Sequence, residues 1–167
     1  MKRTTLFQAT LILSLIFAAT AAAQAQNRRA AIDYIARGTV KMDANDLDGA
    51  IADFTRAIEL DRNYAASYFS RGLARRRVSD LDGAISDFTK SIQLNPIAEA
   101  YLDRGAVLKD KGDRDGAIAD YTKAIELNEK YADAYYNRGI ALDDKGDHDA
   151  AIADFTRAIE LNPQHAR

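Results

Sequence analysis

The chain contains no cysteine, and this absence excludes several kinds of site. Without cysteine the protein has no disulfide bonds, no thiolate ligands for a metal and no thiol nucleophile. Bacterial lipid attachment also requires a cysteine, so that form of membrane anchoring is excluded. Any catalytic or metal site would therefore have to be built from the other polar residues.

Histidine is almost as scarce. The two histidines are His148, between two predicted helices, and His165, close to the C-terminus, and they lack the spacing of a metal site. The acidic stretch 143–149 superficially resembles a calcium loop, but it lacks the run of oxygen ligands that ends in glutamate. No phosphate-binding glycine loop or nucleophile elbow is present. We therefore expect no enzymatic activity, no metal and no cofactor.

Positive charge is not in excess. The chain has 23 Lys and Arg against 25 Asp and Glu, for a formal charge of −2. A general nucleic-acid-binding protein is usually basic, so we expect no nucleic-acid partner. The hydrophobic set makes up 47% of the residues, which is enough for a packed core.

The N-terminus differs from the rest of the chain. A basic start, "MKR", precedes an apolar stretch that is densest over residues 11–19. Ala-x-Ala cleavage signals then end at Ala23 and Ala25. This order is that of a secretory signal peptide. The apolar core is also shorter than the roughly 20 residues that span a bilayer. We therefore predict a signal peptide at 1–25, with cleavage after Ala23 or Ala25.

The alternative is an uncleaved membrane anchor. The residues after the apolar core are small and polar and carry no stop-transfer charge, which favours cleavage. The protein is then exported, with the bacterial periplasm as the predicted location and an extracellular location as the alternative. After cleavage no stable membrane anchor would remain.

One phrase repeats four times after residue 30. The dipeptide Arg-Gly recurs every 33 or 34 residues, and each copy is followed by a segment similar to "DGAIADFTRAIEL". Such self-similarity is the sequence signature of a repeat architecture. Nearly the whole of the predicted mature domain, 26–167, divides into the units 31–64, 65–97, 98–131 and 132–165.

Each unit has the pattern of two helices. In the first unit these run from Ala31 to about Ala44 and from about Leu47 to Leu60. Apolar residues of the second helix recur at intervals of three and four, which is helical periodicity. In each unit an aspartate precedes the second helix, where it can cap the N-terminus. In the second and fourth units a proline follows the end of this helix, which a proline cannot continue. These residues are Asp46, Asp80, Asp113 and Asp147, with Pro96 and Pro163.

The units resemble tetratricopeptide repeats. That family has a 34-residue pattern of an aromatic residue, glycine, alanine, a second aromatic residue, alanine and a closing proline. The fourth unit matches at Tyr135, Gly139, Ala151, Phe155, Ala158 and Pro163. The resemblance implies an all-α fold, a right-handed superhelical solenoid of four helix–turn–helix repeats. No unit of such a solenoid can bury its apolar stripe without a neighbour.

Two positions depart from the family pattern in every unit. Arginine precedes the glycine, where leucine is usual, and aspartate precedes the aromatic residue of the second helix. We predict structural Arg–Asp ion pairs, either within or between units. The alternative is that each charge faces solvent, where a pair contributes only about 0–1 kcal/mol. The residues are Arg37, Arg71, Arg104 and Arg138, with Asp53, Asp87, Asp120 and Asp154.

Family resemblance also implies a binding surface on the concave face, formed by the first helix of each unit. We predict a groove there with apolar residues at its centre and a charged rim, which would bind a peptide or helix of a partner protein. The alternative for the apolar residues is that they belong to the core between helices. The candidates are Phe69, Leu73, Arg76, Leu102, Lys109, Tyr136, Asn137, Ile140 and Asp143.

The last unit suggests a second function. Members of the family commonly add a polar helix that covers the last repeat, and here the chain stops directly after the fourth unit. The outer face of the last helix carries Ile152, Phe155 and Ile159, and an exposed apolar patch marks a site of association. The alternative prediction is therefore a self-associating, envelope-organising protein, a homo-oligomer formed through its C-terminal repeat.

Overall fold

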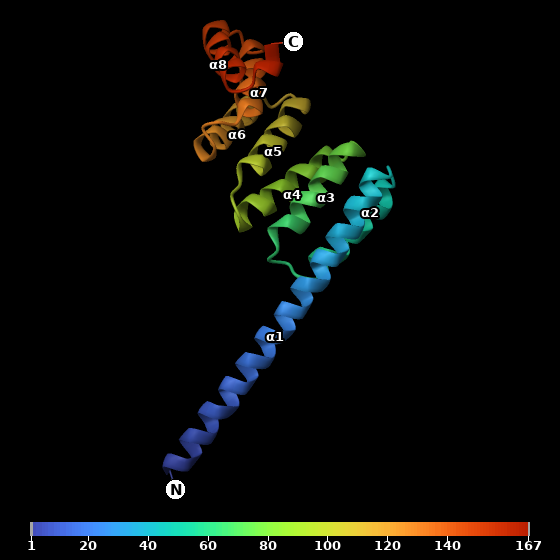
Figure 1. Ribbon diagram of the computed structural model, residues 1–167, viewed down its shortest axis with the longest axis vertical. Helices are drawn as coiled ribbons and strands as arrows, with labels where there is room; N and C mark the ends of the chain where they lie inside the picture. Colours follow the sequence, from blue (N-terminus) through green and yellow to red (C-terminus); the bar gives the residue numbers. More distant parts are fainter. Residues whose placement is uncertain (1, 167) are drawn as a thin grey trace.

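The computed structural model describes the backbone of residues 2–166 and the side chains of residues 17–164. All regular elements in that part are helices, so the predicted all-α fold is confirmed (Figure 1). Most of the apolar stretch of the predicted signal peptide lies outside the described side chains. The helices are α1 (Lys2–Asp43), α2 (Leu47–Leu60), α3 (Ala65–Arg77), α4 (Leu81–Leu94), α5 (Ala98–Asp110), α6 (Arg114–Leu127), α7 (Ala132–Asp143), α8 (His148–Leu161) and a short 3₁₀ helix, η1 (Pro163–Ala166).

Helix α1 is longer than the sequence pattern predicts. It continues without interruption from Lys2, so the prediction that the first helix begins at Ala31 is wrong. Residues 2–30 contain neither glycine nor proline, and nothing local interrupts the helix. The N-terminal part of α1 extends away from the other helices as a single rod (Figure 1). No helix in the described part of the chain is both long and apolar enough to cross a bilayer.

The remaining helices form a linear array of pairs. Each predicted unit contains one odd-numbered and one even-numbered helix, and α2, α4 and α6 also pack against the next odd helix. Successive odd helices touch one another, whereas contacts between even helices are at most marginal in the described chain. The odd helices therefore line the inner side of the array, and the first and last repeats lie at its opposite ends (Figure 1).

Small residues allow the two helices of a unit to approach closely. The ring of Tyr121 is fully buried against Gly105, where an added Cβ would lie 2.8 Å from Cε1 of the ring. The same contact joins Gly38 to Phe54 and Gly72 to Phe88. Alanines fill the remaining space in each joint, so the core repeats with the sequence.

The turns between the two helices of a unit have the predicted capping residues and, at one further position, a positive φ that was not predicted. The capping aspartates accept a hydrogen bond from the backbone N–H three residues later, as Asp113 does from Gly116 at 2.9 Å. The turns pass through the left-handed region at Asn45, Gly112 and Gly146, which suits asparagine and glycine. Ser79 takes this place in the second unit, a position where the sequence pattern did not predict a positive φ.

Candidate functional site

The predicted Arg–Asp residues lie together inside each unit. The guanidinium of Arg104 donates from Nε and Nη2 to the two carboxylate oxygens of Asp120, both at 2.7 Å. Arg138 makes the same paired contact with Asp154, at 2.7 and 2.8 Å. The other two units repeat it with Arg37 and Asp53 and with Arg71 and Asp87. The aspartates are buried, which the planar fork of arginine compensates with two charge-assisted hydrogen bonds.

Each of the last three arginines also reaches the preceding unit. The remaining nitrogen, Nη1, donates to a threonine hydroxyl on the previous even helix, as Arg104 does to Thr89 at 3.0 Å. Arg71 and Arg138 reach their threonines at 3.1 Å. One side chain therefore connects three helices of two units. Sequence reasoning missed the threonines, although "FT" or "YT" follows every one of these aspartates.

A second cation supports the aspartate in the first two units. The Nζ atom of Lys41 lies 2.9 Å from Asp53, and Nη1 of Arg75 lies 2.9 Å from Asp87. The hydrogen bonds from Arg37, helped by Lys41, lower the pKa of Asp53 to about 2. In the last two units the equivalent positions are leucines, Leu108 and Leu142, so Asp120 and Asp154 each depend on a single arginine.

The apolar candidates for the groove fall into two groups. Phe69 and Leu73 are half-buried and pack on the core between α4 and α5, with the Phe69 ring centred 5.7 Å from that of Phe88. Leu102 likewise packs against two core clusters that α5 shares with α6 and α7. These three serve largely as core residues. On α7, Ile140 is half-buried like these three, whereas Tyr136 is 38% exposed although its ring is centred 5.8 Å from that of Phe155.

The charged candidates have different surroundings. Arg76 of α3 bridges to Asp103 of α5 at 3.3 Å, and burial raises the pKa of Asp103 while Arg76 opposes that rise. Asp143 contacts Nδ1 of His148 at 2.7 Å, a partner that the sequence did not suggest. Lys109 is half-buried on α5, and its side chain has no hydrogen bond or ion pair among the described residues.

Asn137 is committed to its own helix, because its side-chain amide donates to the backbone carbonyl of Asp133 at 2.8 Å. Of the charged candidates, Arg76 and Asp143 thus have partners of opposite charge, whereas Lys109 has no acidic partner among the described residues.

Two protein-family models match parts of the chain. The model described as tetratricopeptide repeat matches residues 132–165, and the model described as TPR repeat matches residues 38–78 and 105–146. Together they cover more than half of the chain. The chain belongs to the tetratricopeptide repeat family. No curated protein matches the chain.

Solved structures of other tetratricopeptide repeat (TPR) proteins share the fold. The crystal structure of MamA is 29% identical with a TM-score of 0.76, and the match covers 81% of this chain and 80% of that one. YrrB, described as a TPR protein with an unusual peptide-binding site, is 28% identical with a TM-score of 0.72, covering 81% and 71%. The first TPR domain of Spaghetti (RPAP3), bound to the HSP90 peptide SRMEEVD, is 22% identical with a TM-score of 0.70, covering 71% and 95%. This last likeness shows the fold alone.

The TPR array has a hollow on its inner side that the sequence did not predict in full. It has a volume of about 380 Å³ and is lined by Met42, Leu73, Arg76 and Arg77. Arg77 donates to the backbone carbonyl of Met42 at 2.8 Å and so closes one side of it. Leu73 and Arg76 were predicted here. Met42 and Arg77 were missed because the hollow forms between two repeats.

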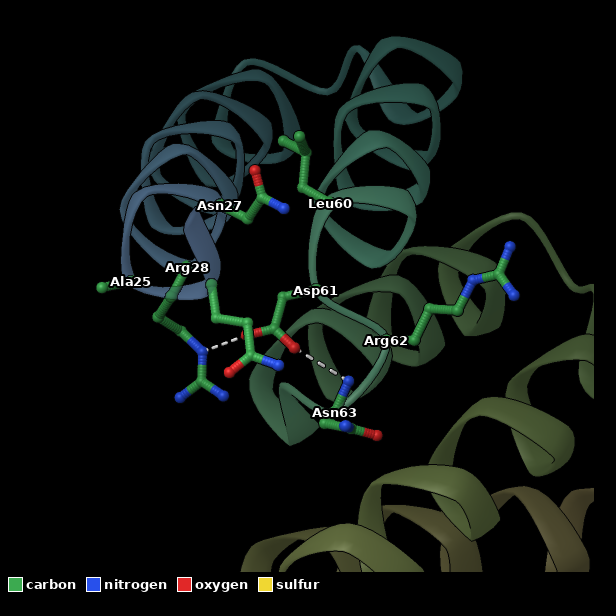
Figure 2. Close-up of a pocket in the computed structure, with 8 residues that line it drawn as sticks. Ala25, Asn27, Arg28, Leu60, Asp61, Arg62 and Asn63 are labelled. Carbon is green, nitrogen blue, oxygen red and sulfur yellow. Dashed lines mark hydrogen bonds and ion pairs between the residues drawn. The ribbon is translucent and has the colours of Figure 1, made fainter. Parts of the chain in front are cut away.

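A larger hollow of about 490 Å³ lies between α1 and the turn that leads from α2 to α3. Figure 2 shows Arg28 of α1 directed toward Asp61, with which it forms an ion pair. The same guanidinium lies 4.5 Å from the centre of the Tyr64 ring. These contacts attach α1 to the repeats just beyond Ala25, where cleavage of the signal peptide is predicted.

The TPR repeats carry no assembled metal site in their described part, since no three His, Cys, Asp or Glu residues lie close enough to share an ion. TPR domains are in general interaction modules rather than catalysts. The arrangement of apolar side chains and charges on the odd helices is suited to binding a macromolecular partner.

Proposed function

We propose that this TPR protein is a non-catalytic scaffold that binds a peptide or helix of a partner protein on its inner face. The observation that carries the proposal is Lys109 of α5, a half-buried lysine whose side chain has no acidic partner among the described residues. A ligand carboxylate would give this ammonium group a charge-assisted hydrogen bond, which is stronger at a partly buried position than in open solvent.

Two solved relatives of the fold support the proposal. YrrB has a peptide-binding site, and the RPAP3 domain holds a peptide whose sequence, SRMEEVD, is acidic near its end. Binding by an array of repeats uses the surface that successive units share. Here that surface runs along α1, α3, α5 and α7.

The charges of the inner face favour a ligand of mixed polarity. Lys109 offers a site for an acidic group at the level of α5. Further along, α7 carries the exposed carboxylates of Asp133 and Asp143, which favour a basic group. Between them, Tyr136 and Ile140 provide an apolar contact for one or two ligand side chains.

Site-specific photocrosslinking tests the surface directly. A photoreactive phenylalanine in place of Tyr136 is expected to capture one partner protein, and Lys109→Glu in the same chain is expected to weaken that capture strongly. The matched control places the same group at Ala119, which is exposed on α6 away from the inner face. Equal capture from Ala119, or full capture after Lys109→Glu, would show that the inner face is not the binding surface.

We also propose that the protein is exported, with the periplasm as its site of action. The support is the order of basic, apolar and small residues before Ala25. Mass spectrometry of the chain recovered from a periplasmic fraction is expected to show an N-terminus at Gln24 or Gln26. An intact N-terminus in the membrane fraction would contradict the proposal.

Self-association is the second candidate function, and one observation favours it. Ile159 of α8 is 40% exposed, whereas the equivalent Ile58, Ile92 and Ile125 are each 9% exposed. A self-associating exported protein would be suited to organising other components of the cell envelope.

A further inference from the structure

We propose that two copies of the chain associate head to tail, with α1 of one copy covering the outer face of α8 of the other. In this contact α1 would occupy the place that each odd helix takes on the preceding even helix. The inference rests on the second candidate function, self-association, and names its two surfaces. It is independent of ligand binding on the inner face.

The outer face of α8 carries the side chains that an even helix uses to contact the next repeat. This face carries Ile152, Thr156 and Ile159, and the other even helices have the same residue types at these positions. In those helices the following odd helix covers the face. On α8 Ile152 is 62% exposed, and Thr156 is exposed as well. The face is therefore built to receive an odd helix.

Helix α1 carries the side chains that an odd helix uses to contact the preceding repeat. Val40 occupies the position at which Val107, on α5, is fully buried against the core of the preceding unit, yet Val40 is 68% exposed. Arg37 is 57% exposed at its side chain, against 20% for Arg104. Tyr34 of α1 occupies the position that Tyr68, Tyr101 and Tyr135 hold in the later units.

The polar groups of the two faces are complementary. In all three interior joints the threonine hydroxyl accepts from the arginine of the next unit, and in the last of them Thr122 also donates to the carbonyl of Ile118. Thr156 already donates to Ile152 at 2.8 Å. Arg37 holds Asp53 but has no preceding threonine in the described chain. Docking would let Arg37 donate to Thr156 of the second copy.

One residue limits the strength of this contact. Ser67, Ala100 and Ala134 are fully buried in the interior joints, and the equivalent residue of α1 is the exposed Asp33. Covering the Asp33 carboxylate removes it from water, which costs free energy. A head-to-tail contact leaves one free face at each end of the assembly, so it can extend into filaments unless the copies close into a ring. Asp33 therefore keeps the association weak and the assemblies short.

Sedimentation velocity of the full chain, measured over a wide range of concentrations, tests the proposal. Ile152→Lys disrupts the proposed contact surface on α8, and Val40→Lys disrupts the proposed contact surface on α1. Each is expected to weaken self-association by about tenfold or more, because it places a charge among buried apolar groups. Asp33→Ala is expected to strengthen it. Circular dichroism of each variant checks that the repeats remain folded.

The matched control is Val78→Lys, which adds a lysine directly after α3 and outside both faces. Lysine is the natural residue at this position in the later units, Lys111 and Lys145, where it pairs with Asp82 and Asp115. This variant is expected to associate as the wild type does.

A mixing experiment separates head-to-tail contact from a two-fold symmetric one. Neither Ile152→Lys nor Val40→Lys should associate alone, but each keeps one intact face, so an equimolar mixture is expected to form a heterodimer. If Val40→Lys alone associates like the wild type, two α8 faces meet and the head-to-tail contact is wrong, although self-association stands. If the wild type and Asp33→Ala both remain monomeric at every concentration, the inference and the self-association function both fail.

Discussion

The third unit carries a hydroxyl that its sister units lack. Tyr121 stands where the other units have phenylalanine, and its ring is fully buried against Gly105. Its hydroxyl has no hydrogen-bond partner within the described structure. Burial raises the pKa of this phenol to about 12, so the group stays neutral but remains unsatisfied. A buried polar group in this state destabilises the folded chain.

Tyr121→Phe is therefore expected to stabilise the protein. Removal of a buried hydroxyl without a partner should raise the free energy of unfolding by about 1 kcal/mol. Urea denaturation measures the change, and Phe88→Tyr serves as the reverse control, since it places a hydroxyl in the equivalent position of the second unit. A loss of stability in Tyr121→Phe would show that the hydroxyl has a partner in solution.

At the scale of the helices, one arginine connects three elements in each interior joint. Arg104 joins α5 to α6 through Asp120 and to α4 through Thr89. The sequence predicted the Arg–Asp residues because two opposite charges replace the usual residues in all four units. It left open whether they pair within or between units. The arginines of the last three units do both: each pairs with an aspartate of its own unit and donates to a threonine of the preceding unit.

Loss of the arginine should cost more in the third unit than in the first. Arg104→Met leaves a buried carboxylate without a cation, which is expected to lower the free energy of unfolding by about 3 kcal/mol. Arg37→Met should cost less, because Lys41 still lies 2.9 Å from Asp53. Arg104→Met combined with Asp120→Leu should recover most of the loss. Urea denaturation of the four chains provides the comparison, and equal losses at Arg104 and Arg37 would contradict it.

Helix boundaries were predictable where local signals are strong. The start and end of α2 follow from its capping aspartate and the apolar period, and the structure has the same bounds. The start of α1 was not predictable in this way, because a signal-like sequence can also form a helix. Ser79 was missed since serine has no marked preference for the left-handed conformation, and the joint around it imposes the turn.

At the scale of the whole molecule, the array is held together only by contacts between neighbours. Stability in such an array is a sum of repeat and interface contributions. Helices α4 and α5 have neighbours on both sides, whereas α8 packs mainly on α7. The centre of the array is therefore expected to be its most stable part.

Hydrogen exchange followed by mass spectrometry should show this gradient. Backbone amides of α4 and α5 are expected to exchange more slowly than those of α8, because opening at the end breaks one interface and opening at the centre breaks two. The measurement is made at low protein concentration, so that any self-association does not protect α8. Equal protection along the array would indicate a single cooperative unit.

The sequence by itself determined the period, the paired helices, the capping residues and the identity of the Arg–Asp residues. These features depend on contacts inside one unit, and four similar copies make their pattern readable. Tertiary structure decided which odd-helix residues belong to the core, as with Phe69 and Leu102, because these helices contact neighbours on more than one side. It also decided that Val40 is exposed where Val107 is buried, since exposure depends on whether another helix covers the same position.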